Sequence, residues 1–167
     1  MPLRPESPPD APAIAALVSE AFLTAPHADG TEADIVARLR DAGALTLSLV
    51  SEGPDGLDGH IAASPVTLNG HPGWAGIGPL AVRPDRQGRG IGAALMAAAL
   101  DRLRHAGFRG AVLVGDPGYY RRFGFTPHPG LAVPGIPSDY VLGLSFNSQP
   151  PTGAIAYHPA FGLDAST

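Results

Sequence analysis

The spacing of hydrophobic residues divides the chain into helical and extended segments. Apolar residues that recur every three or four positions predict three amphipathic helices, over residues 13–22, 32–42 and 91–106. A shorter helix is predicted over 118–123, directly before Gly124. The segment 91–106 is rich in alanine, so we expect this long helix to pack closely against a sheet.

Short apolar or alternating runs predict seven strands between and after these helices. The runs are 3–5, 45–50, 60–68, 74–82, 111–114, 140–146 and 154–157. Turn-forming residues separate successive runs at 53–56 and at Asn69-Gly70. This order predicts an α/β (α+β) fold with a mixed central sheet of about six to seven strands flanked by helices. It also predicts a single domain over residues 1–167.

Composition narrows the class of protein. A chain of 167 residues with 44% hydrophobic residues and a mean hydropathy of +0.09 is long enough to bury one core. No apolar run is long enough to span a membrane, and the N-terminus lacks the pattern of a secretory signal. The chain has no cysteine and its histidines show no paired spacing, so we expect no disulfide and no metal site. These features predict a cytoplasmic protein without a membrane partner.

Charge is distributed unevenly along the chain. The formal net charge is −4, yet eight of the eleven basic residues lie between Arg83 and Arg122, where only three acidic residues occur. A local positive field of this kind suits a polyanionic ligand. The acidic chain as a whole, with no interleaved basic and aromatic residues, argues against a nucleic-acid partner.

The most informative segment is the glycine-rich loop between the strand that ends at Val82 and the helix that begins near Ile91. Glycines let backbone N–H groups approach an anion, and a helix start adds unpaired donors. A nucleoside-triphosphate loop would require a lysine, which the chain lacks. A dinucleotide loop requires Gly-x-Gly-x-x-Gly, whereas Gly88, Gly90 and Gly92 are separated by single residues. A tight turn before a core helix is the alternative to a phosphate site.

The loop does satisfy the pattern Gln/Arg-x-x-Gly-x-Gly/Ala, through Gln87, Gly90 and Gly92. In this it resembles the coenzyme A pyrophosphate loop of the GNAT N-acetyltransferase superfamily. The order of helices and strands over nearly the whole chain is also similar to the GNAT topology. Three further segments resemble the bacterial YhbS-like group of predicted N-acetyltransferases: 78–82, 115–125 and 157–161.

The resemblance implies a site for acetyl-CoA. In the family, the strand before the loop splays from its neighbour, and its freed backbone groups bind the pantetheine arm. Carried over, these groups belong to Leu80, Ala81 and Val82, with the Leu80 N–H directed at the thioester carbonyl. The resemblance also assigns cofactor contacts to the loop, the helix start and the short helix, namely Gln87, Gly88, Arg89, Gly90, Ile91, Gly92, Ala93, Tyr119 and Tyr120.

Tyr120 is the predicted general acid. It lies four residues before Gly124, which matches the family tyrosine whose hydroxyl protonates the departing sulfur. The unperturbed pKa of a phenol, near ~10, is close enough to that of a thiol for this transfer. Packing of the short helix onto the sheet is the alternative role for Tyr120, and Tyr119 is the neighbour that could replace it.

A general base is harder to predict. Many family members place a glutamate on the strand before the loop, but the segment 74–82 contains no Asp, Glu or His. The scattered alternatives are His27, Asp29, Glu32, His71 and His158. Each of them also fits an ordinary surface residue, and an amine of low pKa could instead lose its proton through ordered water.

The sequence therefore predicts an enzyme, an acyl-CoA-dependent N-acyltransferase. We expect it to transfer acetyl from acetyl-CoA to a primary amine by direct attack in a ternary complex, without a metal. The expected acceptor is a small molecule or a peptide, and the expected assembly is a monomer or a homodimer. Because the strand glutamate is missing, a non-catalytic acyl-CoA-binding module that acts as a sensor or scaffold is the alternative.

Overall fold

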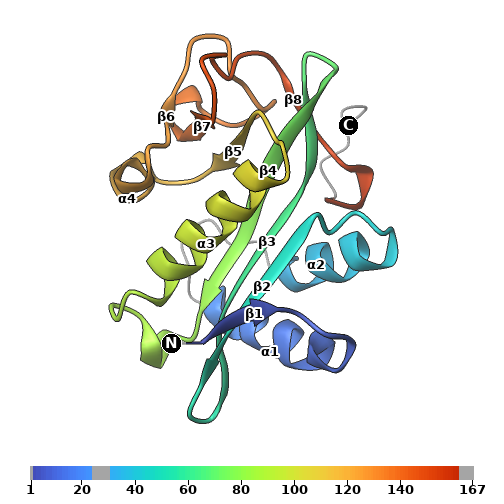
Figure 1. Ribbon diagram of the computed structural model, residues 1–167, viewed down its shortest axis with the longest axis vertical. Helices are drawn as coiled ribbons and strands as arrows, with labels where there is room; N and C mark the ends of the chain where they lie inside the picture. The colour runs from blue at the N-terminus through green and yellow to red at the C-terminus, as the bar shows by residue number, and fades with distance from the viewer. Residues whose placement is uncertain (1, 24–30, 162–167) are drawn as a thin grey trace.

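The computed structural model describes residues 2–23 and 31–161. Within these residues, eight strands join one mixed sheet in the order β1-β2-β3-β4-β5-β7-β6, and β8 pairs with β3 outside this path (Figure 1). The strands are β1 (Leu3–Pro5), β2 (Leu47–Gly53), β3 (Gly56–Leu68), β4 (His71–Val82), β5 (Gly110–Val114), β6 (Thr126–Pro127), β7 (Val141–Ser145) and β8 (Ile155–Tyr157). The mixed sheet flanked by helices is thus confirmed.

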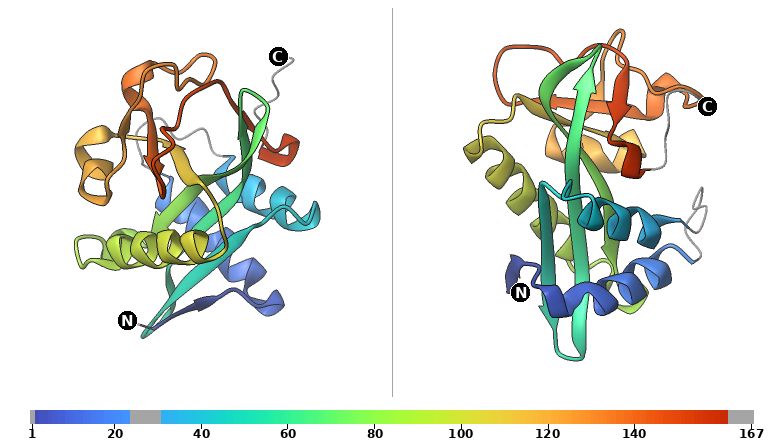
Figure 2. Two further views of the ribbon diagram at one scale, coloured as in Figure 1. Left: turned by 45° about the horizontal axis from the view of Figure 1, so that its top comes forward. Right: turned by 90° about the vertical axis from the view of Figure 1, so that its right-hand side faces the viewer.

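Helices cover both faces of the sheet. The four α-helices of the described chain are α1 (Ala11–Ala21), α2 (Glu32–Asp41), α3 (Ile91–His105) and α4 (Pro117–Tyr120). Helices α1 and α2 lie on one face and α3 lies on the other, as the side view in Figure 2 shows. The predicted short helix is shorter than expected, because Arg121–Phe123 continues as a 3-10 turn that ends at Gly124.

Two details of the sheet differ from the predicted pattern. The hairpin between β2 and β3 turns tightly over Pro54-Asp55, so β3 begins at Gly56 and not at His60. An eighth strand, β6, pairs two residues with the edge of β7. A two-residue strand carries too little alternation to be found from sequence alone.

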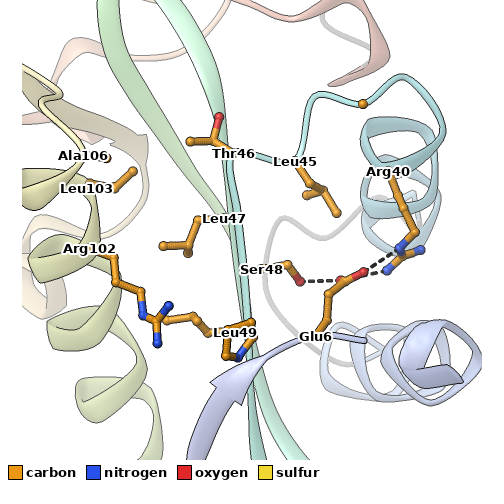
Figure 3. A pocket seen from close by; sticks show the side chains of 12 residues that line it. Glu6, Arg40, Leu45, Thr46, Leu47, Ser48, Leu49, Arg102, Leu103 and Ala106 are labelled. Carbon is orange, nitrogen blue, oxygen red and sulfur yellow. Dashed lines mark hydrogen bonds and ion pairs between the residues drawn. The ribbon is translucent and has the colours of Figure 1, made fainter. Parts of the chain in front are cut away.

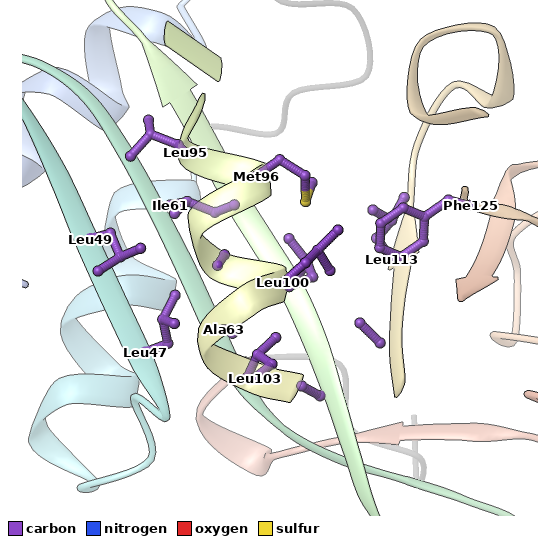
Figure 4. Close-up of a cluster of buried hydrophobic side chains, with 14 of the residues drawn as sticks. Leu47, Leu49, Ile61, Ala63, Leu95, Met96, Leu100, Leu103, Leu113 and Phe125 are labelled. Carbon is purple, nitrogen blue, oxygen red and sulfur yellow. The ribbon is translucent and has the colours of Figure 1, made fainter. Parts of the chain in front are cut away.

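The largest cluster of buried side chains lies between α3 and the sheet (Figure 4). Leu95, Met96 and Leu103 of α3 are almost fully buried there, against Leu49 and Ile61 of β2 and β3. Closest approach occurs at Gly59 of β3, where an added Cβ would lie 2.7 Å from Ile91 Cγ2 and 2.8 Å from Leu95 Cδ1. The first turn of α3 therefore rests directly on the β3 backbone, and this contact fixes where the helix starts.

Strand β4 separates from β5 part of the way along its length. In the described sheet the two strands pair in parallel only over Trp74–Gly76, and β4 then continues to Val82 without β5. The register between β3 and β4 shifts at the same place, since Ala63 pairs with Ile77 but Ile61 pairs with Leu80. The extra residue forms a bulge at Gly78-Pro79, where Gly78 has φ +141°. This geometry confirms the predicted splayed strand.

Candidate functional site

The splay leaves backbone groups of β4 unpaired on the side that faces away from β3. The Arg83 N–H donates to the Asp58 carbonyl at 2.9 Å, so these two residues form a hydrogen-bonded pair of the antiparallel ladder. Since hydrogen-bonded and non-hydrogen-bonded pairs alternate, Ala81 bonds to His60 of β3, whereas the N–H groups of Leu80 and Val82 point the other way. Two of the three predicted pantetheine-binding residues thus direct backbone groups into the open side of β4.

The loop after β4 presents a second set of backbone donors. Gly88 and Gly90 have φ values of +79° and +82°, which L-residues rarely adopt, and Gly90 is the N-cap of α3. The first bond of the helix runs from the Ala94 N–H to the Gly90 carbonyl at 3.0 Å. The N–H groups of 91–93 therefore lack helical acceptors, and such donors at the positive end of a helix dipole suit an anionic ligand.

These groups line one cavity of about 500 Å³ between the end of β4, the loop, the start of α3 and α4. Its lining includes most of the predicted cofactor residues, namely Leu80, Val82, Gln87, Gly88, Gly90, Ile91, Gly92, Ala93, Tyr119 and Tyr120. Two predicted residues lie outside it. The Ala81 side chain is buried with the cluster on the α1/α2 face, and Arg89 lines a neighbouring cavity of about 270 Å³.

Sequence reasoning missed Arg86, which lines both of these cavities. Its Nε atom lies 3.6 Å from Oδ2 of Asp58, a carboxylate whose side chain is only 4% exposed. Gly53 makes room for this carboxylate, since a Cβ there would lie 2.6 Å from Asp58 Oδ2. A buried carboxylate needs a cationic partner, so the pair orients Arg86 beside the loop. The local excess of arginine was the only signal for it in the sequence.

The two adjacent tyrosines reach different parts of the cavity. The Tyr119 hydroxyl lies 3.1 Å from the position that a Cβ would take at Gly92, beside the helix start, and Arg122 stacks 4.4 Å above the Tyr119 ring. The Tyr120 ring packs against Gly115 and edge-on against Phe125. Neither hydroxyl has a hydrogen-bond partner within the described residues.

Burial raises the pKa of Tyr120 to about 12, with smaller contributions from Tyr119 and Asp116. The phenol of Tyr120 therefore stays protonated throughout the neutral range. Asp116 itself holds the start of α4, because its carboxylate accepts the Gly118 N–H at 2.9 Å. Asp116 is thus the N-cap of the short helix that carries both tyrosines.

The predicted base candidates do not gather at this cavity. Glu32 begins α2, His71 begins β4 at the end of that strand remote from the loop, and the His158 Nδ1 accepts the Ala160 N–H at 3.0 Å. His27 and Asp29 lie outside the described residues. The described segments contain no group of three or more His, Asp or Glu side chains arranged to hold a metal. None of their helices has the length and apolar character needed to cross a bilayer.

A mixed sheet that splays beside a glycine loop and a helix start is the architecture of acyl-CoA-dependent acetyltransferases, and comparison with known proteins agrees. The chain matches the acetyltransferase (GNAT) family over residues 13–125. It is 37% identical to the uncharacterized N-acetyltransferase YhbS of Escherichia coli K12, over 95% of this chain and 97% of YhbS. The chain therefore belongs to the GNAT acetyltransferase family.

Two solved structures are similar over almost the whole chain. One is a GNAT family acetyltransferase from Brucella melitensis in complex with acetyl-CoA, with 46% identity, a TM-score of 0.84 and coverage of 96% of this chain and 97% of that one. The other is Escherichia coli YhbS in complex with CoA, with 35% identity, a TM-score of 0.87 and coverage of 96% and 91%. The resemblance to the YhbS-like group is thus confirmed.

Proposed function

We propose that this protein transfers the acetyl group of acetyl-CoA to a primary amine by direct attack in a ternary complex. The observation that carries the proposal is the convergence of three kinds of group on one cavity: the N–H groups of Leu80 and Val82 that face away from β3, the helix-start donors and the tyrosine hydroxyls. The complexes of the two similar proteins with acetyl-CoA and CoA support the same ligand here.

The residues of the cavity fit this ligand. The N–H groups of 91–93 and the loop around Gly88 and Gly90 would hold the pyrophosphate, and Arg86 would add positive charge. Gln87 closes the loop onto the strand, since its side chain donates to the Val82 carbonyl at 3.3 Å. The open side of β4 would bind the extended pantetheine arm through main-chain hydrogen bonds.

In the reaction, the neutral amine attacks the thioester carbon, and the carbonyl oxygen becomes an oxyanion. The Leu80 N–H would stabilise that oxyanion, a contact worth ~3 kcal/mol in comparable sites. The intermediate then collapses as the C–S bond breaks, and the Tyr120 hydroxyl donates its proton to the departing thiolate. The nitrogen, positively charged after its attack, releases one proton to ordered water, and the Tyr120 phenolate takes one proton back from water. Tyr120 holds its proton at neutral pH, because burial raises its pKa to about 12; the same burial makes it a weaker acid than a free tyrosine.

Two experiments test the proposal: one measures acetyl-CoA binding and the other measures turnover. Calorimetric titration with acetyl-CoA should show binding to the wild type and none to Gly90→Glu, which places bulk and negative charge where the pyrophosphate would sit. Because Gly90 has positive φ, Gly90→Ala is the control for backbone strain, and it should bind more weakly but measurably. Unchanged affinity in a folded Gly90→Glu variant would contradict the loop assignment.

Turnover is measured as CoA thiol release with a panel of amines, namely 2-phenylethylamine, spermidine, an aminoglycoside, a lysine peptide and a peptide with a free α-amino group. An acetylated product identified by mass spectrometry supports the proposal. Binding of acetyl-CoA without thiol release from any amine would favour the sensor or scaffold module instead. The acceptor class, the cytoplasmic location and the choice between monomer and homodimer stay predictions.

A further inference from the structure

Two ion pairs that lie beside cavities differ in how fully their groups are hydrogen-bonded. Beside a cavity of about 550 Å³ at the edge of β2, between α2 and α3, Glu6 accepts two hydrogen bonds from Arg40, at 2.8 Å and 3.0 Å (Figure 3). In the pair of Asp58 and Arg86, beside the glycine loop, the distance from Nε to Oδ2 is 3.6 Å, which is too long for a hydrogen bond. The first pair is complete, whereas the second has hydrogen-bonding groups left for a ligand.

A β-bulge in β3 determines where the Asp58 side chain lies. Ser51 of β2 pairs with Gly59, but the next residue, Glu52, pairs with Leu57, so Asp58 is the extra residue between them. Bulges redirect a side chain away from the regular alternation of a strand. The redirected side chain of Asp58 is only 4% exposed and lines the cavity of about 270 Å³ beside the loop.

Three contacts connect Asp58 with the turn that precedes the glycine loop. The Arg83 N–H donates to the Asp58 carbonyl at 2.9 Å, and the Arg86 N–H donates to the Arg83 carbonyl at 2.8 Å. The third contact is the ion pair between Arg86 and the Asp58 carboxylate. The backbone of Asp58 thus holds the start of the 3-10 turn Pro84–Arg86, and its side chain holds the end. The tip of the β2–β3 hairpin therefore determines where the Arg86 side chain lies.

The polar atoms of this pair lack hydrogen-bond partners. Among the described residues, the Arg86 guanidinium donates no hydrogen bond, and its Nε is buried. Oδ1 of Asp58 is buried without a donor. Arg86 also lines the cavity of about 500 Å³ that contains the glycine loop, and the residues that line this cavity include Arg122 but no acid. A guanidinium with unused N–H groups suits a phosphate, which it can bind through two parallel hydrogen bonds.

We propose that Asp58 is a positioning residue for acetyl-CoA binding: it holds Arg86 so that the guanidinium binds a phosphate of the cofactor. This inference rests on the proposed function. The Asp58 carboxylate faces Nε of Arg86, which leaves the two terminal nitrogens for phosphate oxygens. Asp58 acts through Arg86 and does not itself contact the cofactor. The phosphate site then extends from the loop and the helix start to the tip of the β2–β3 hairpin.

The sign of one substitution separates positioning from simple attraction between charges. Asp58→Asn removes a negative charge near the loop, so Coulomb attraction alone would make an anionic ligand bind more tightly. If Asp58 positions Arg86, the same substitution weakens binding, because the guanidinium loses the partner that holds it. Asparagine has the shape of aspartate, so it fits the narrow space beside Gly53.

Calorimetric titration with CoA measures the effect of single and double variants. Arg86→Gln should weaken binding by about 10–100-fold, as expected for lost hydrogen bonds to a charged group, and Asp58→Asn by about tenfold. The double variant should bind no more weakly than Arg86→Gln, because Asp58 acts only through Arg86. Titration with 3′-dephospho-CoA identifies the phosphate. If Arg86→Gln still weakens that ligand, Arg86 binds the pyrophosphate, and if it does not, Arg86 binds the 3′-phosphate.

The ion pair of Arg83 and Asp85 supplies matched controls. It lies in the same turn at 3.1 Å, and its side chains line neither of the two cavities beside the loop. Arg83→Gln and Asp85→Asn remove the same charges as the test variants. Each should leave the affinity for CoA within about twofold of the wild type, because exposed pairs contribute little.

Nitrogen-15 NMR of the Arg86 Nε–H group gives a second readout, which a merely structural role of Asp58 would not move. The signal, assigned by its loss in Arg86→Gln, should exchange slowly with water in the wild type and shift when CoA binds. Asp58→Asn should lose the slow exchange. The wild-type shift tests the phosphate contact even if Asp58→Asn does not fold.

The outcomes separate this inference from the proposed function. Wild-type affinity for CoA in folded Arg86→Gln or Asp58→Asn, or tighter binding by either, would overturn the inference and leave the proposed function intact. A further loss when Asp58→Asn is added to Arg86→Gln would overturn it too, because Asp58 would then act independently of Arg86. An Arg86 Nε–H signal that CoA does not shift would count against the phosphate contact. Failure of the wild type to bind either CoA or acetyl-CoA would overturn both.

Discussion

Tyr119 and Tyr120 are adjacent in the sequence, yet their side chains have different neighbours around the cavity. The Tyr119 hydroxyl lies beside the helix start at Gly92, where it suits a contact with the phosphates. Tyr120 is packed deeper, among Phe123 and Phe125, and burial raises its pKa to about 12. The sequence predicted both tyrosines as site residues, but only the packing of α4 shows that their rings contact different residues around the cavity.

Tyr120→Phe removes one hydroxyl and keeps the ring that packs against Phe125. Turnover should fall by about 10²-fold, because the thiolate then leaves without a positioned acid. The acetyl-CoA affinity and the melting temperature should barely move. The measurement is kcat under conditions where chemistry limits the rate, with Tyr119→Phe as the matched variant. If Tyr119→Phe lost the activity and Tyr120→Phe did not, the acid would be Tyr119.

At the scale of the elements, the contact of α3 with β3 controls the loop. The helix begins where Ile91 and Leu95 rest on the bare backbone of Gly59, so the donor N–H groups are placed by packing and not by the loop alone. A side chain at Gly59 would lift the first turn of α3 away from the sheet. The same movement would displace the unpaired N–H groups at the helix start, which are the proposed pyrophosphate donors.

Gly59→Ala should therefore affect stability and binding together. Its Cβ would lie 2.7 Å and 2.8 Å from side-chain atoms of Ile91 and Leu95, and such overpacking costs about 1–3 kcal/mol of unfolding free energy. The affinity for acetyl-CoA should fall as well, because the helix start moves. Urea unfolding and calorimetric titration measure the two effects. A destabilised variant with wild-type affinity would show that the loop holds its shape without α3.

The elements were predictable to different degrees for physical reasons. Local sequence patterns were enough to predict α3, because its apolar and alanine residues repeat at helical spacing over many residues. They were also enough to predict the glycine loop, because the spacing of its glycines is specific. The start of β3 was placed too late, because the tight hairpin extends pairing into Gly56, which has no strand propensity of its own. Arg86 directly precedes the loop in sequence, but it was missed as a site residue because the tertiary contact with Asp58, which no local pattern indicates, orients it.

At the scale of the whole molecule, hydrogen bonds connect Arg40 of α2, Glu6 after β1, Ser48 of β2 and His60 of β3. The protonation of the buried His60 therefore affects the stability of the fold. The folded-state pKa of His60, about 4, lies below its ordinary value of 6.5. Below pH 6.5 the unfolded chain binds a proton at this site that the folded chain refuses, so the stability falls as the pH drops from 6.5 toward 4. Above pH 6.5 this contribution is fully retained.

The expected loss is about 2 kcal/mol of unfolding free energy between pH 7 and pH 5. Urea unfolding at the two pH values measures it. Glu6, whose pKa is lowered, stays ionised over this window and does not contribute. His60→Gln cannot titrate and should show a flatter dependence, although its stability at pH 7 is lower. If the unfolding free energy of the wild type and of His60→Gln fell equally between pH 7 and pH 5, His60 would not be buried in its neutral form.

The whole-molecule arrangement also predicts that the base candidates suggested by sequence are dispensable. His71 is exposed at the start of β4 and lies about 30 Å along that strand from Leu80. His158 follows β8, and Glu32 begins α2, so neither lines the cavity of the proposed site.

Separate alanine variants of His27, Asp29, Glu32, His71 and His158 should each keep kcat/KM within about tenfold of the wild type, well short of the 10²–10⁴ expected for a lost proton-transfer group. The shape of the pH–rate profile should also stay the same, because the group that accepts the proton is unchanged. The measurement is kcat/KM against pH for each variant, with an amine that the wild type acetylates. A thousandfold loss in one variant, together with loss of the acidic limb, would make that residue the base.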